Sequence, residues 1–331
     1  NYTFTYAYMS KCNIAAKIHK LSMMEPISYK KLAYRLEEME RASGITYNEK
    51  QKEAITKALE QNVLIITGGP GTGKTTIIRA IVELYQMLND LNDDELVKEL
   101  CLLAPTGRAS KRMSESTLLP ASTIHRFLKW NKENNEFRVN EENKDKSKLI
   151  IIDEVSMIDT LLMDSLLKGL MDNIKLIMVG DFNQLPSVGP GQVLKDMIES
   201  GVIDTVHLDL LYRQDENSYI PTLALEIKEN NLSDHYLETK SDYTFLQCSS
   251  ASIRENLKEL CRTVIHKGYD YKRVQVMAPM YRGENGIDNL NRELQDVFNP
   301  PSDEKREITY GEVIFREHDK ILQLVNQPEE N

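Results

Sequence analysis

The stretch that decides the fold is Val63-Leu-Ile-Ile-Thr-Gly68-Gly-Pro-Gly-Thr-Gly-Lys74-Thr75. From Gly68 onward it matches G-x-x-x-x-G-K-[ST], with an apolar run before it and a helix-like segment, Thr76–Leu88, after it. Glycines let the backbone wrap closely around a phosphate, so that N–H groups and a helix N-terminus face its negative charge. A glycine-rich turn that binds nothing is the alternative, and the complete motif in this context argues against it. We therefore expect a phosphate-binding loop for ATP, whose contacts are Gly69, Gly71, Thr72, Gly73, Lys74, Thr75 and Thr76.

Short apolar runs recur on both sides of this loop and indicate the fold class. Each run is continuous rather than alternating, which is typical of strands buried on both faces of a parallel sheet. Helix-like segments separate the runs, so we expect a doubly wound α/β domain with its ligand sites at the carboxyl ends of the strands. The runs are Val63–Ile66, Cys101–Ala104, Leu149–Ile152 and Leu176–Val179.

Composition sets limits on the protein class. The 331 residues are 41% hydrophobic and 28% charged, and the apolar runs are far shorter than the roughly 20 residues that a membrane span needs. The four cysteines form no Cys-x-x-Cys pair, which argues against a disulfide framework or zinc site and fits a reducing cytoplasm. The net charge of −10 by itself disfavours a nucleic-acid partner, although a basic groove can lie on an acidic body.

The sequence divides into four parts. Residues 1–44 are expected to be the helical tail of an N-terminal module, and residues 45–205 a complete α/β ATPase domain. Residues 206–300 are expected to be part of a second α/β domain, with a strand at Val274–Met277, and residues 301–331 the start of a β-rich insertion. Within the first domain, two apolar segments around the polar stretch Asn131–Asn135 predict a β-hairpin in residues 127–148.

Four further residues complete the expected hydrolytic site. Asp153 ends an apolar strand and is a candidate Mg²⁺ ligand, and Glu154 is a candidate general base for the attacking water. Gln184 follows the next strand and is a candidate sensor of the γ-phosphate; a plain surface residue is the alternative. Arg213 is a candidate for stabilising charge in the transition state, with a surface ion pair as the alternative.

Taken together, the ordered blocks resemble the RecD-like superfamily 1B DNA helicases, the family of the exodeoxyribonuclease V alpha subunit and of stand-alone RecD-like helicases. The most specific blocks are Ala104-Pro-Thr-Gly-Arg-Ala109 and Thr123-Ile-His-Arg126. The resemblance extends over nearly the whole chain and includes Tyr47–Ile55, Thr67–Thr76, Leu103–Arg112, Ser122–Arg126, Ile152–Asp159, Val179–Gly191, Leu211–Gln214 and Ala278–Gly286.

The resemblance implies two RecA-like lobes, the first complete and the second partial, and it assigns roles to individual residues. Gln51 would recognise adenine. The DNA-binding positions would be Pro105, Thr106, Arg108, Thr123, His125 and Arg126 on the first lobe, with Met280, Tyr281 and Arg282 as further candidates on the second. The 127–148 hairpin falls where such helicases carry a pin that separates the strands; a solvated connector is the alternative. Members carry more motifs beyond the position where this chain ends, so we expect a fragment, with a β-barrel insertion starting near Phe315.

The function implied is an ATP-dependent DNA helicase that moves 5′→3′ on single-stranded DNA in repair and recombination, with ATP and Mg²⁺ as cofactors. Single-stranded DNA and duplex junctions would be its partners, together with other helicase or nuclease subunits. A second hypothesis is a DNA-binding ATPase subunit of an exonuclease complex with a regulatory role. A third, a relaxase–helicase fusion, needs a histidine cluster, and the six histidines are widely spaced in this sequence.

Overall fold

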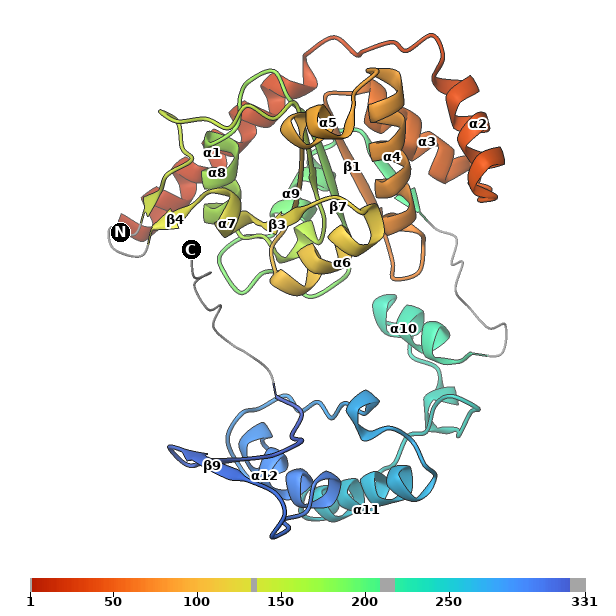
Figure 1. Ribbon diagram of the computed structural model, residues 1–331, viewed down its shortest axis with the longest axis vertical. Coiled ribbons are helices and arrows are strands. Elements are labelled where there is room, and N and C mark those ends of the chain that lie inside the picture. The colour runs from red at the N-terminus through yellow and green to blue at the C-terminus, as the bar shows by residue number, and fades with distance from the viewer. Residues whose placement is uncertain (1, 132–135, 209–217, 322–331) are drawn as a thin grey trace. The chain divides into compact units, whose positions relative to one another are not determined.

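The computed structural model describes residues 2–131, 136–208 and 218–321. The chain divides into two compact units, Asn1–Leu232 and Ser233–Asn331, and each is described separately. Figure 1 shows the helices and strands of both. Among the described residues, no helix combines the length and the apolarity that crossing a membrane requires.

The first unit is built on one six-stranded sheet in which every pairing is parallel. The strand order across the sheet is β3-β2-β6-β7-β1-β8. The four apolar runs of the sequence all form strands here, which confirms the expected α/β class. The strands are β1 (Val63–Gly68), β2 (Leu100–Ala104), β3 (Ala121–Thr123), β6 (Leu149–Ile152), β7 (Lys175–Gly180) and β8 (Thr205–Leu208).

Helices cover both faces of this sheet, and each face has its own apolar core (Figure 1). Alternate residues of one strand enter opposite cores: Leu64 and Ile66 of β1 lie in one, and Val63 and Ile65 in the other. The first core is closed by α2 (Leu32–Ser43), α3 (Glu49–Glu60), α4 (Lys74–Leu88), α5 (Asp93–Glu99) and α6 (Gly107–Thr117). The second is closed by α1 (Tyr2–Ser22), α7 (Ile124–Phe127), α8 (Thr160–Lys168) and α9 (Val193–Ser200).

The N-terminal 44 residues belong to the first compact unit. Helix α1 packs beside α8, where the hydroxyl of Ser10 donates to the buried carboxylate of Asp164 at 2.8 Å. Helix α2 packs on the other face through Leu32, Leu36 and Met39. The two helices therefore contribute to both cores of the sheet.

The expected hairpin is present. Strands β4 (Trp130–Asn131) and β5 (Glu136–Phe137) pair antiparallel, with Trp130 directly opposite Phe137. Its tip, residues 132–135, lies outside the described residues. The base of the hairpin is anchored because Leu128 and Val139 are buried in the second core.

Two strand assignments beyond residue 205 differ from the sequence expectation. Strand β8, where the second domain was expected to begin, pairs with β1 and so belongs to the first sheet. Val274–Met277, expected to be a strand, forms none. An apolar run predicts a strand but not its partner, and in the described part of the second unit these residues have no partner strand.

The second unit contains a small apolar cluster of Cys261, Leu290 and Leu294. Its described strands β9 (Glu307–Tyr310) and β10 (Val313–Arg316) form an antiparallel pair, which agrees with β structure expected after residue 301. The helices here are α11 (Ile253–His266) and α12 (Ile287–Phe298), with 3-10 turns η2 (Asp234–Leu237), η3 (Ser250–Ser252) and η4 (Tyr271–Arg273). The remaining elements, η1 (Val155–Met157) and α10 (Ile220–Lys228), belong to the first unit.

Candidate nucleotide-binding site

The loop between β1 and α4 has the backbone of a phosphate-binding loop. Gly71 and Gly73 have φ values of 84° and 89°, in the left-handed region that glycine adopts without strain. A side chain at Gly73 would also collide with Gln51, since its Cβ would lie 2.5 Å from Gln51 Nε2. Thr72 is buried, and its hydroxyl donates to the carbonyl of Gly69 at 2.9 Å. The loop is thus pre-shaped as a nucleotide-binding P-loop.

Lys74 begins α4 and folds back over the loop. Its Nζ donates to the carbonyls of Gly68 and Gly69 at 2.6 and 2.9 Å. Burial lowers the pKa of Lys74, and the negative charges of Asp181, Asp153 and Glu154 oppose that shift, Asp181 most strongly. Among the described residues, the hydrogen-bond acceptors of Lys74 Nζ are these two neutral carbonyls, which it can exchange for phosphate oxygens.

Asp153 and Glu154 follow β6 at the same edge of the sheet. Asp153 Oδ1 accepts a hydrogen bond from the amide of Glu154 at 2.9 Å, and burial raises the pKa of Asp153 to about 6. Glu154 has φ 53°, a left-handed conformation that is strained for a residue with a side chain. Its Oε2 is buried and has no hydrogen-bond partner among the described residues. Such an oxygen is available to a ligand, to water or to a cation.

Asp181 is a further site residue, and no motif in the sequence assigned it a role. It follows β7 directly, and β7 lies between β6 and β1, so Asp181 stands between the acidic pair and the P-loop. It is only 5% exposed, and its Oδ1 accepts from the amide of Asn183 at 3.0 Å. An acid immediately after a buried parallel strand was the signal that could have identified it.

The other predicted nucleotide contacts occupy different environments. Gln51 is buried and engaged at both ends, since its Nε2 donates to Thr72 O at 3.2 Å and its Oε1 accepts from the Asn48 amide at 3.2 Å. Thr75 is exposed and Thr76 partly exposed on the first turn of α4. Gln184 is exposed on the loop after β7, and Arg213 lies outside the described residues.

The predicted DNA-binding blocks meet at the ends of β2 and β3. These strands are parallel neighbours, with Ala104 paired to Thr123, so the segments that follow both strands leave the sheet side by side. The hydroxyls of Thr106 and Thr123 cap α6 and α7, accepting from the amides of Ala109 and Arg126 at 3.2 and 3.3 Å. Exposed side chains therefore remain as the candidates for contact, and they are Arg108, His125 and Arg126, with Pro105 partly exposed beside them.

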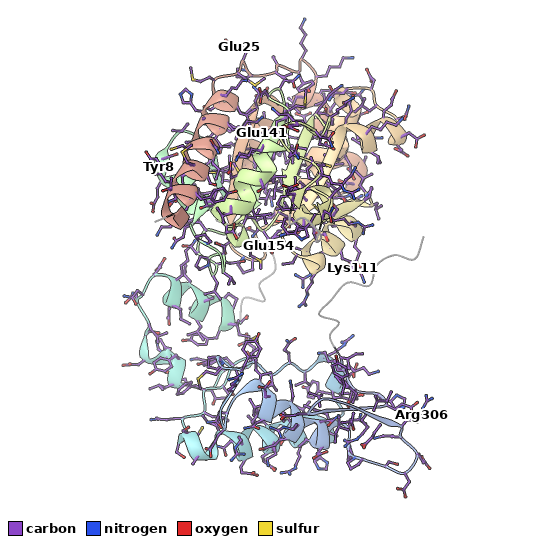
Figure 2. All side chains as sticks on the ribbon, turned by 90° about the vertical axis from the view of Figure 1, so that its left-hand side faces the viewer. Tyr8, Glu25, Lys111, Glu141, Glu154 and Arg306 are labelled. Atoms are coloured by element: carbon purple, nitrogen blue, oxygen red, sulfur yellow. The ribbon has the colours of Figure 1, made fainter. Side chains whose placement is uncertain are left out.

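Both sets of residues lie at one end of the first unit. The P-loop, Asp181, Asp153, Thr106 and Thr123 each follow or end a strand of the same parallel sheet, so all lie at its carboxyl edge. Figure 2 shows Glu154 and Lys111 of α6 at this end of the unit and Glu25 at the opposite end. Arg282 is exposed in the second unit, next to the exposed Met280 and Tyr281.

Comparisons with known proteins show which families and proteins this chain is similar to. Residues 51–190 match the family described as an AAA domain. The chain is 32% identical over 279 residues to the ATP-dependent RecD2 DNA helicase of Deinococcus radiodurans, a match that covers 84% of this chain and 36% of that protein. It is 34% identical over 198 residues to the RecBCD enzyme subunit RecD of Haemophilus influenzae, covering 52% of this chain and 30% of that protein.

Among solved structures, the chain is similar to the Pif1 helicase from Candida albicans, with 19% identity and a TM-score of 0.45, over 68% of this chain and 56% of that one. The curated relatives confirm the resemblance seen in the sequence blocks. The chain spans roughly a third of their length.

Proposed function

We propose that this chain, a relative of the RecD-like DNA helicases of superfamily 1, is the ATP-hydrolysing part of a DNA helicase. The observation that carries the proposal is that both sets of residues lie at the carboxyl edge of one sheet. There Asp153 after β6, Asp181 after β7 and the P-loop after β1 follow one another along the edge, and the paired ends of β2 and β3 come next on the β6 side. Nucleotide chemistry and a strand-binding surface on one rigid sheet can be coupled by small shifts of the loops between them.

The residues present fit ATP with Mg²⁺. The left-handed Gly71 and Gly73 and the amides at the start of α4 would receive the phosphates, and Lys74 would exchange its carbonyl partners for phosphate oxygens. Thr75 and Asp153 would hold the metal ion, which neutralises phosphate charge when bound. The proposed role for Gln51 is adenine recognition; its contact with Thr72 O links that position to the P-loop.

Glu154 is the proposed general base. Its unpaired Oε2 can accept the proton of an attacking water, and its strained backbone holds the carboxylate at the end of β6. Gln184 would position the water or sense the γ-phosphate, and Arg213 would stabilise the charge that develops during phosphoryl transfer. These roles follow from chemistry and from the resemblance.

For DNA, the proposed contacts on the first unit are the exposed Arg108, His125 and Arg126, with Pro105, Thr106 and Thr123 shaping the backbone around them. Contacts of this kind hold phosphates and leave the base sequence unread. Arg282 is proposed as a contact from the second unit. Movement in the 5′→3′ direction and a division into two RecA-like lobes belong to the same proposal.

A second candidate is a DNA-binding ATPase subunit of a larger nuclease. It is favoured by the similarity to a protein named as a RecBCD enzyme subunit. In this case other subunits would be partners, and the isolated protein would hydrolyse ATP without unwinding DNA. Unwinding by the isolated protein would contradict this candidate.

The test is the ATPase rate of the wild type and of Lys74→Ala, each with and without single-stranded DNA. We expect DNA to stimulate the wild type, and Lys74→Ala to lower kcat by about 100-fold or more, the usual loss for one preorganised charge contact. Lys98→Ala is the matched control, because Lys98 is exposed on α5 at the amino edge of the sheet. A wild-type rate that does not respond to DNA would contradict the helicase proposal.

A further inference from the structure

The loop that follows Asp181 packs tightly against the start of α8. The amide of Thr160 donates to the carbonyl of Pro190 at 2.9 Å, and Thr160 is buried. Ser187 fixes the loop internally, since its hydroxyl lies 3.1 Å from the carbonyls of both Gly189 and Gly191. The segment from Ser187 to Gly191 is therefore fixed internally by Ser187 and joined to α8 by one backbone hydrogen bond.

Two glycines make this packing possible. A Cβ at Gly189 would overlap the Asp159 carboxylate and lie 2.6 Å from its Cγ. A Cβ at Gly191 would overlap the hydroxyl of Thr160, and Gly191 also has φ 99°. A side chain at either position requires a shift of the Asp159 or Thr160 side chain or of the loop itself.

The start of α8 is closely connected to the proposed general base. Glu154 is followed by the 3-10 turn η1 (Val155–Met157), and Asp159 then caps α8 by accepting from the Leu162 amide at 2.8 Å. The end of β7 also touches this turn, because a Cβ at Gly180 would lie 3.2 Å from the Val155 amide nitrogen. The segment after Glu154 is thus contacted at Val155 by the end of β7 and at Asp159 and Thr160 by the loop.

We propose that Gly189 and Gly191 are positioning residues for ATP hydrolysis: by seating the loop after Asp181 on Asp159 and Thr160, they hold the Glu154 turn in place. The loop and the turn then move as one body, so that the exposed Gln184 and the buried Oε2 of Glu154 keep a fixed relation. This inference rests on the proposed function, since it assigns Glu154 a part in hydrolysis.

The experiment compares Gly189→Ala with the wild type in three measurements: kcat for ATP hydrolysis, affinity for a fluorescent ADP analogue, and the thermal midpoint. We expect kcat to fall about 10- to 100-fold, because displacing a reacting group by about 1 Å has effects of this size. Nucleotide affinity should stay within about twofold, because the P-loop is not touched. Gly191→Ala should behave in the same way.

Gly201→Ala is the control for Gly191→Ala, because Gly201 is left-handed with φ 65° but has nothing within 4 Å of its Cβ position. Its kcat should equal that of the wild type. A compensating pair keeps the inference testable if Gly189→Ala is unstable: Asp159→Gly removes the side chain that the added methyl group would strike, and glycine is tolerated at a helix N-cap. In the Asp159→Gly background the Gly189→Ala change should therefore cost nothing, so the double variant Asp159→Gly/Gly189→Ala should have a kcat at least as high as that of Asp159→Gly alone.

Two results would overturn the positioning role while leaving the proposed function intact. One is a Gly189→Ala variant with wild-type kcat. The other is a parallel loss of nucleotide affinity, thermal midpoint and kcat that the double variant does not reverse. If Lys74→Ala hydrolysed ATP as fast as the wild type, or if the wild type hydrolysed none, the proposed function would be overturned, and this inference with it.

Discussion

The single positive charge of Lys74 interacts with three carboxylates, those of Asp181, Asp153 and Glu154. This excess of negative charge repels a triphosphate until a divalent cation is present. We therefore expect Asp181→Asn to strengthen ATP binding in EDTA by about 10-fold, or roughly 1.4 kcal/mol, and to reduce the gain in affinity that Mg²⁺ gives. Titration of a fluorescent ATP analogue with and without Mg²⁺ measures both.

Asp94→Asn is the control for this charge change, because Asp94 is exposed on α5, before the amino end of β2. Unchanged binding in EDTA for Asp181→Asn would show that Asp181 does not act on the phosphates. Lys74, Asp153 and Glu154 were predictable from the sequence because motifs mark them. Asp181 has only the general signal of an acid after a buried strand, because its place between the acidic pair and the P-loop depends on β7 lying between β6 and β1, and strand order across a sheet is not written in chain order.

At the scale of elements, the β4–β5 hairpin presents an aromatic face. Trp130 is 39% exposed, its ring centroid lies 4.8 Å from that of Phe137, and Phe137 lies 5.9 Å from the ring of His125. If the hairpin separates DNA strands, Trp130→Ala should lower the unwinding rate of a forked duplex about 10-fold, because stacking of one base on an aromatic ring contributes about 1–3 kcal/mol. ATPase activity stimulated by single-stranded DNA should stay within about twofold.

Tyr34→Ala is a matched control, since Tyr34 is an aromatic residue 58% exposed on α2. Equal unwinding by Trp130→Ala and the wild type would instead favour the solvated connector.

Elements were predictable where periodicity or turn residues carry the signal. The four buried strands and the hairpin were found from the sequence, since each has a local pattern. Two predictions were wrong: β8 was assigned to the next domain, and Val274–Met277 to a strand. Strand pairing depends on residues far away in the sequence, which a local pattern does not reveal; Val206, for example, pairs with Ile66, 140 positions earlier.

At the scale of the whole molecule, a net charge of −10 opposes binding to a polyanion. In the proposed function, affinity for single-stranded DNA would therefore come from local cations such as Arg108 and Arg126, and we expect it to fall steeply as salt rises. Replacing both by Ala should weaken binding to all sequences alike and flatten the slope of log K against log salt by about 1.4, or about 0.7 for each phosphate that is no longer neutralised. Fluorescence anisotropy of labelled oligonucleotides at several salt concentrations measures this.

Lys30→Ala/Lys31→Ala is a control for the same change of net charge, since both lysines are exposed next to α2. An equal change of slope in this control would mean that the overall field, and not the β2–β3 edge, sets the affinity. The overall charge is known from the sequence alone, whereas the gathering of Thr106, Thr123 and their neighbouring cations at one edge required the sheet.

Trp130 is the only tryptophan in the sequence, and it lies half-exposed on the hairpin. The protein therefore has an intrinsic optical probe in the element whose role is in question. Excited at wavelengths where the 15 tyrosines do not absorb, its emission comes from that one place. A nucleobase stacked on the indole quenches it, while nucleotide binding at the P-loop, whose proposed contacts do not include Trp130, would act on it through movement of the hairpin. Stopped-flow recording of the tryptophan fluorescence can thus follow the arrival of a nucleobase at the hairpin in real time, on the unlabelled protein.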